Sequence, residues 1–147
     1  MKPNKRFYGR RRIRSLRQKE KDLMKTFLPE IELIPSSDGT FLDLSTYFGK
    51  STQQFWLEVG FGKGEHLLWQ AQNNEDVGFI GAEPFLNGVA SLLSKIKEKN
   101  INNIRIFPDA VSQILHSLPS QSINKVFVLF PDPWPKSRHQ KRRLINK

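Results

Sequence analysis

Short apolar runs alternate with segments of helical hydrophobic spacing from residue 55 onward, and this alternation restricts the possible folds more than any other feature. Short runs of apolar, β-branched and aromatic residues are typical of buried strands, whereas apolar residues repeating every three to four positions are typical of helices. The pattern predicts strands over 55–59, 77–82, 103–107 and 125–130 and helices over 65–73, 86–99 and 110–118. Strands that alternate with helices form a parallel sheet covered on both faces. We therefore expect an α/β fold that binds ligands at the carboxyl ends of its strands.

The segments before residue 55 differ in composition. Residues 1–27 are rich in arginine, and Leu23 and Phe27 indicate partial helical order that runs into the following segment. An arginine-rich, acid-poor N-terminus is also compatible with an organelle transit peptide. Proline, serine and glycine mark turns in residues 28–54, which are expected to be irregular. We predict a basic N-terminal arm over 1–27 and one domain over 28–147, incomplete at its C-terminus.

Composition narrows the class of protein. With 147 residues, of which 37% are hydrophobic, the chain can build one domain with a core. Cysteine is absent, which excludes disulfides and thiolate metal sites, and the three histidines stand in separate contexts, so no metal is expected. No run approaches the roughly 20 apolar residues of a membrane helix. We expect a cytoplasmic protein without a membrane partner, and the sequence leaves monomer and homodimer open.

Charge is strongly segregated along the chain. Residues 1–25 carry eleven Lys and Arg against two acids, and residues 136–147 carry six against none, whereas the part between them has a net charge of −5. An acidic domain between two basic segments indicates a polyanionic partner. Nucleic acid is the first choice and an anionic membrane surface the second.

The first predicted strand ends in a glycine-rich turn that carries an acid. Gly60, Gly62 and Gly64 are spaced two residues apart, and Glu58 stands two residues ahead of the first. Glycines at such a turn let a ligand approach the backbone closely. The spacing differs from the dinucleotide pattern G-x-G-x-x-G, and the carboxylate suits a cationic ligand better than a pyrophosphate. The alternative is a purely structural turn with Glu58 facing the helix and solvent.

Acids also follow the second and third predicted strands. Glu83 stands where an acid accepts hydrogen bonds from ribose hydroxyls, in nicotinamide and adenosyl ligands alike. The alternative for Glu83 is a turn acid ahead of Pro84. Asp109 could accept from an adenine amino group, or it could cap the next helix.

A proline-rich, cationic segment follows the fourth predicted strand. Residues 130–143 read Phe-Pro-Asp-Pro-Trp-Pro-Lys-Ser-Arg-His-Gln-Lys-Arg-Arg. Alternating prolines exclude an ordinary helix or a central strand. The carboxylate of Asp132 beside the ring of Trp134 suits a nucleobase, and the cations suit phosphates. The candidate cations are Lys136, Arg138, His139, Lys141, Arg142 and Arg143. The alternatives are a core anchor at position 134 and a solvated helix start after it.

Taken together, these motifs resemble those of the bacterial tRNA (guanine-N7-)-methyltransferase family. The resemblance rests on Glu-x-Gly-x-Gly-x-Gly at 58–64, Gly-x-Glu at 81–83, Asp-Ala at 109–110 and the segment at 130–143, which is highly specific to that family. It implies a Rossmann-like class I methyltransferase fold, S-adenosylmethionine as cofactor and a guanine in the tRNA variable loop as acceptor.

The resemblance also implies roles for individual residues. The donor site would be formed by Glu58, the three glycines, Glu83, Asp109 and Asp132, with Asp132 between donor and base as the catalytic or base-positioning residue. Trp134 and Lys136 would contact the substrate, and residues 138–143 would contact RNA. The family usually acts without a metal, so the resemblance implies none here.

The chain departs from the family in its length, because class I methyltransferases normally have seven strands and only four are predicted here. The fourth strand is therefore expected to leave an open apolar sheet edge. A catalytically inactive RNA-binding fragment is the alternative function. A nicotinamide-dependent enzyme is a third, which the glycine spacing and the proline-rich segment disfavour.

Overall fold

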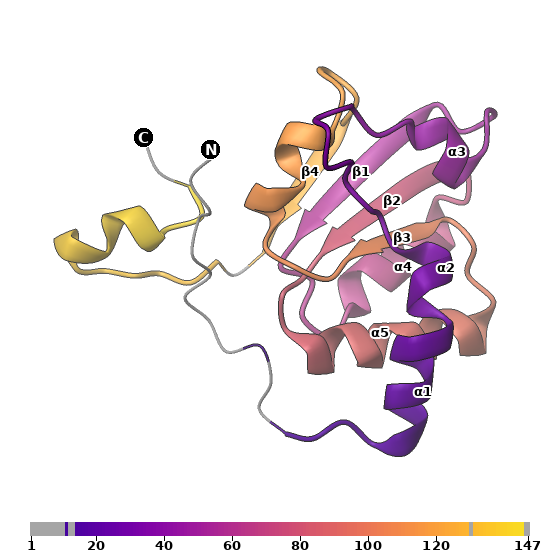
Figure 1. The fold of residues 1–147 in the computed structure, drawn as a ribbon, viewed down its shortest axis with the longest axis horizontal. Helices are drawn as coiled ribbons and strands as arrows, with labels where there is room; N and C mark the ends of the chain where they lie inside the picture. Colours follow the sequence, from indigo (N-terminus) through magenta and orange to yellow (C-terminus); the bar gives the residue numbers. More distant parts are fainter. Residues whose placement is uncertain (1–10, 12–13, 130, 146–147) are drawn as a thin grey trace.

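A parallel four-stranded sheet forms the centre of the computed structural model, which describes residues 11, 14–129 and 131–145 (Figure 1). The strands are β1 (Gln54–Val59), β2 (Val77–Ala82), β3 (Ile104–Phe107) and β4 (Lys125–Val128). Their spatial order is β3-β2-β1-β4, and every neighbouring pair is parallel. This confirms the predicted α/β architecture. The predicted end of the fourth strand, Phe130, lies outside the described residues.

Two long helices cover one face of the sheet, and both have the bounds that their hydrophobic spacing predicts. These are α4 (Glu65–Asn73) and α5 (Leu86–Lys99). Leu67 of α4 and Leu92 of α5 are completely buried and pack in one core with Phe79 of β2. Their burial removes the apolar sides of both helices from water, which is the main favourable contribution to folding.

Two further helices extend this layer beside α5 (Figure 1). They are α1 (Gln18–Thr26) and α2 (Leu28–Ile31), and Leu23 and Leu28 belong to the same core. The expected helical order around Leu23 is thereby confirmed. Residues 1–10 and 12–13 of the predicted basic arm lie outside the described residues.

The opposite face of the sheet carries shorter elements. Asp43 caps α3 (Leu44–Phe48) by accepting from the backbone N–H of Ser45 at 3.0 Å. The expectation of an irregular segment over 28–54 is therefore wrong for α2 and α3, whose few residues are too short to show a hydrophobic period.

The predicted helix over 110–118 is also wrong in type. Two short 3₁₀-helices replace it, η1 (Val111–Gln113) and η2 (Leu115–Ser117). Val111, Ile114 and Ser117 are buried at intervals of three residues. This interval matches the three residues per turn of a 3₁₀-helix, in which such side chains lie directly above one another.

The end of the described chain leaves the sheet. β4 pairs with β1 on one side, and no strand among residues 11, 14–129 and 131–145 pairs with its other edge, where Val126 is 53% exposed. Beyond it, the 3₁₀-helix η3 (Ser137–Arg142) stands apart from the sheet (Figure 1). Within the described residues, no helix combines the length and apolar character needed to cross a membrane.

Candidate active site

The glycine-rich turn after β1 has the open backbone that its sequence predicts. Gly60, Gly62 and Gly64 have φ values of +70°, +59° and +77°, which side chains rarely adopt. A Cβ on Gly60 or Gly62 would meet no atom within 4 Å, so the space above the turn is open. A Cβ on Gly88 of α5 would lie 2.1 Å from the carbonyl O of Gly62, so helix and turn are in direct backbone contact.

Glu83 connects the ends of β1 and β2 through its carboxylate. One oxygen accepts from the N–H of Gly62 at 2.7 Å and the other from the N–H of Phe85 at 2.8 Å. Burial raises the pKa of Glu83, the two backbone N–H groups oppose that rise, and the negative charge of Asp132 adds to it. The negative charge of Asp132 therefore links the start of the proline-rich segment electrostatically to Glu83.

Glu58 is buried near the carboxyl end of β1, a strand that lies between β2 and β4. Only 3% of the residue is exposed, and its Oε2 lies 2.7 Å from Nδ1 of His66 in α4. Burial raises the pKa of Glu58, and the contact with His66 opposes that rise. The alternative of a solvated acid is therefore wrong, although Glu58 does face the helix.

Asp109, at the end of β3, is paired with the arm. Its Oδ2 lies 3.1 Å from Nη2 of Arg11, and its Oδ1 accepts from the N–H of Ala110 at 2.7 Å. The carbonyl O of Arg11 in turn accepts from the N–H of Leu86 at 2.8 Å. Arg11 therefore bridges the start of α5 and the end of β3.

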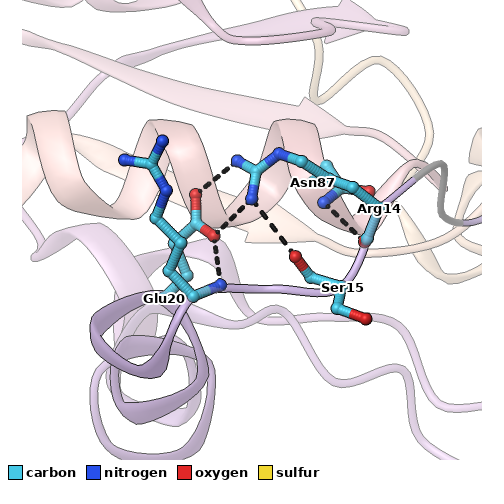
Figure 2. A network of polar contacts seen from close by, with 5 residues as sticks. Arg14, Ser15, Glu20 and Asn87 are labelled. Carbon is cyan, nitrogen blue, oxygen red and sulfur yellow. Dashed lines mark hydrogen bonds and ion pairs between the residues drawn. The ribbon is translucent and has the colours of Figure 1, made fainter.

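A second contact attaches the arm to α5 (Figure 2). Asn87 donates to the carbonyl O of Arg14 at 3.1 Å, and the guanidinium of Arg14 donates to both oxygens of Glu20 at 2.8 and 3.0 Å. The hydrogen bond from Arg14, together with the N–H of Arg17, lowers the pKa of Glu20 to about 2. These contacts link the first turn of α1 to the first turn of α5.

Trp134 is held by its own segment. The ring of His139 lies edge-on at 5.4 Å, the guanidinium of Arg142 lies 5.1 Å from the ring centroid, and Nε of Arg143 donates to the backbone O of Trp134 at 3.1 Å. Trp134 is half-buried, and among the described residues it belongs to neither core cluster, which disfavours the alternative of a core anchor.

The predicted residues fall into two groups in space. Glu58, Glu83 and Asp109 gather with the glycines at the carboxyl edge of the sheet, and Asp132 acts on Glu83 there. The predicted RNA contacts instead lie on the segment that leaves the sheet, where Lys136, Arg138, Lys141 and Arg142 are exposed and His139 and Arg143 are half-buried.

Sequence reasoning missed three residues at this edge. His66 faces Glu58 because it lies in the first turn of α4. The sequence offered one signal for this contact, namely that the predicted helix begins directly after the glycine turn. Gly88 contacts the glycine turn at Gly62. The available signal was that a glycine, an unfavourable helix residue, stands in the first turn of a predicted helix. Arg11 is one of many arginines in the arm, and nothing in the sequence distinguished it.

Comparison with known proteins identifies the fold and the family of the chain. A solved antibiotic-related methyltransferase has the same fold, with a TM-score of 0.51 and 20% identity over 67% of this chain and 53% of its own. Residues 52–147 match the family described as "Putative methyltransferase". The chain belongs to this methyltransferase family.

Individual relatives narrow the comparison. The tRNA (guanine-N(7)-)-methyltransferase of Rhodospirillum rubrum is 46% identical over 95% of this chain, and that of Hyphomonas neptunium is 47% identical, also over 95%. The resemblance inferred from the motifs is thereby confirmed. The chain spans 56% and 63% of the lengths of these two relatives.

Proposed function

We propose that this chain carries the donor site and the first RNA contacts of a cytoplasmic tRNA (guanine-N7-)-methyltransferase that uses S-adenosylmethionine. One observation carries the proposal: the open glycine turn lies at the edge of the sheet where Glu58, Glu83 and Asp109 stand at the strand ends. The negative charge of Asp132, which adds to the raised pKa of Glu83, supports a place for the cationic segment at the same site. The names of the relatives support the same reaction.

The residues at this edge fit the donor. The open space above Gly60 and Gly62 admits a ligand against the backbone, and carboxylates supply acceptors. Glu83 would accept from the ribose hydroxyls and Asp109 from the adenine amino group, while Glu58 would balance positive charge. S-adenosylmethionine supplies an electrophilic methyl group on a sulfonium.

Methylation of guanine N7 does not require a general base. N7 of guanine has a free lone pair, so no proton has to be removed before methyl transfer. The contribution of the chain is alignment and electrostatic complementarity. Asp132 would accept from the N–H groups on the Watson–Crick edge of the base, Trp134 would border the base, and the cations on η3 would bind phosphates.

A methyl-transfer assay tests this function. The chain would be incubated with labelled S-adenosylmethionine and tRNA lacking the modification, and the labelled nucleoside would be identified after digestion. We expect 7-methylguanosine. A matched tRNA with 7-deazaguanosine at the modified position has no N7 and should receive no label. Label on another atom, or equal label on both tRNAs, would overturn the proposal.

The second candidate, an RNA-binding chain without catalysis, rests on the exposed cations of the terminal segment. Binding experiments separate the two candidates. Salt-sensitive tRNA binding without any binding of S-adenosylhomocysteine would favour the second. The nicotinamide alternative predicts binding of NAD instead.

A further inference from the structure

His66, which no sequence motif singled out, is a side-chain partner of the buried Glu58. The 2.7 Å contact joins Nδ1 of His66 to Oε2 of Glu58. A buried carboxylate without a partner is unstable in its charged form. The contact with His66 opposes the rise that burial gives the pKa of Glu58 and so favours the charged carboxylate.

The far side of the imidazole ring shows which proton it carries. Nε2 of His66 lies 3.2 Å from Nε2 of Gln70, one helical turn further along α4. Asn74 donates to Oε1 of Gln70 at 3.3 Å, which orients the amide with its nitrogen toward the ring. Gln70 therefore donates to Nε2, and the proton of a neutral ring is on Nδ1, facing Glu58.

The ring is also held in position. Its edge meets Phe127 of β4, with 4.9 Å between the ring centroids. Phe127 stands opposite Glu58 in the sheet register, so β1, β4 and α4 enclose the pair. The N–H of His66 therefore has a defined direction, as a positioning residue requires.

Among the described residues, charged side chains on the two elements next to Glu58, β4 and α4, are engaged with other groups. The ammonium of Lys125 on β4 lies 3.8 Å from the ring centroid of Trp56, and Glu65 of α4 pairs with Lys95 at 3.0 Å. At the strand ends, Glu83 and Asp132 are themselves acidic. From β2, the residue opposite Glu58 is Gly81, which has no side chain.

We propose that His66 is a positioning residue of the donor site: its Nδ1–H keeps Glu58 ionised and oriented, so that Glu58 can bind the positively charged amino-acid portion of S-adenosylmethionine. This inference rests on the proposed function. A purely structural His66 would stabilise the fold equally whether or not Glu58 is charged, and the two roles differ in their dependence on pH.

The experiment measures binding of S-adenosylhomocysteine by calorimetry between about pH 6 and about pH 8.5. This probe has the amino-acid ammonium but no methyl group to transfer. The variants are His66→Leu, His66→Asn, Glu58→Gln and, as a matched control, His116→Leu at an exposed histidine of η2. Each dissociation constant is divided by that of the unmodified chain at the same pH, which cancels titration of the ligand.

For His66→Leu we expect binding weakened about tenfold at the acidic end of the range, with recovery as pH rises. Without the Nδ1–H, the effect of burial on Glu58 is no longer opposed, so its pKa rises further and the carboxyl is protonated over more of the range. His66→Asn keeps an N–H donor that does not titrate, and should bind within about threefold of the unmodified chain. Glu58→Gln should weaken binding equally at every pH, and His116→Leu should change nothing.

The outcomes separate the two proposals. If the unmodified chain binds and Glu58→Gln weakens binding, but His66→Leu binds normally or loses the same factor at every pH, the role of His66 is refuted and the donor site stands. If the unmodified chain does not bind the probe, or Glu58→Gln leaves binding unchanged, the proposed role of Glu58 in the donor site is wrong and the inference falls with it. Thermal unfolding of each variant by circular dichroism identifies a loss caused by misfolding.

Discussion

Replacing Gly88 by alanine tests whether the contact between α5 and the glycine turn positions the candidate site. The new Cβ would lie 2.1 Å from the carbonyl O of Gly62 and 2.8 Å from its carbonyl carbon. Both are backbone atoms, so they cannot rotate away as a side chain would. Since real Cβ atoms essentially never approach closer than 3.0 Å, helix and turn would have to separate by about 1 Å at this contact.

Two effects of opposite sign decide the magnitude. Helix propensity favours alanine over glycine by about 1 kcal/mol. Overpacking a close contact costs about 1–3 kcal/mol, or more when the backbone has to move. We expect the clash to win, so that Gly88→Ala lowers the free energy of unfolding by about 1–2 kcal/mol. Binding of S-adenosylhomocysteine should also weaken, because displacement of Gly62 disturbs its 2.7 Å hydrogen bond to Glu83.

Urea unfolding followed by circular dichroism gives the free energy, and calorimetry gives the affinity. Ser91→Ala, on the same helix, is the matched control, and propensity predicts a gain of a few tenths of a kcal/mol for it. If Gly88→Ala is at least as stable as the unmodified chain and binds the probe as tightly, the backbone contact does not position the turn and the reasoning is refuted.

Three further predictions concern the proposed catalytic residue, the proposed RNA contacts and the arm. Asp132→Asn should lower the rate of methyl transfer at least tenfold, because the amide has lost the charge that orients the base; full turnover with unchanged affinity for tRNA would contradict this. Arg138→Ala and Lys141→Ala should each reduce the slope of log affinity for tRNA against log salt concentration by about one, and an unchanged slope would place the phosphates elsewhere. Because pairing with Arg14 lowers the pKa of Glu20 to about 2, its contribution to stability is complete above the unfolded value and disappears as pH falls toward 2. Glu20→Gln should therefore be less stable than the unmodified chain at neutral pH, and the difference measured by urea unfolding should shrink on acidification.

The sequence was sufficient for the strands and for the long helices. The spacing of Leu67 with Leu68 and Ala71, and of Val89 with Leu92 and Leu93, is a local property, and these apolar sides become buried wherever the helix meets the sheet. The glycine turn and the acids could also be placed from the sequence, because they directly follow or end predicted strands. Parallel strands all present their carboxyl ends at one edge of the sheet.

The short elements could not be predicted correctly, because hydrophobic spacing is visible only over several turns. α3 has five residues, and η1 and η2 have three each, so none is long enough to show a period. Their conformation is set by the core that they cover, in which Val111 and Ile114 must both reach the sheet. Intrinsic propensity is weak over so few residues, and tertiary packing overrides it.

The sequence by itself determined the strands and long helices, the glycine turn, the family motifs and the placement of acids at the strand ends, because each depends on residues that are close together in the chain. Only the tertiary structure decided what surrounds those acids. Glu58 is buried against His66, Asp109 pairs with Arg11 from 98 residues away, and Asp132 acts on Glu83. Burial and charge depend on neighbours that folding brings together, and these neighbours decide whether a carboxylate is ionised and free to bind a ligand.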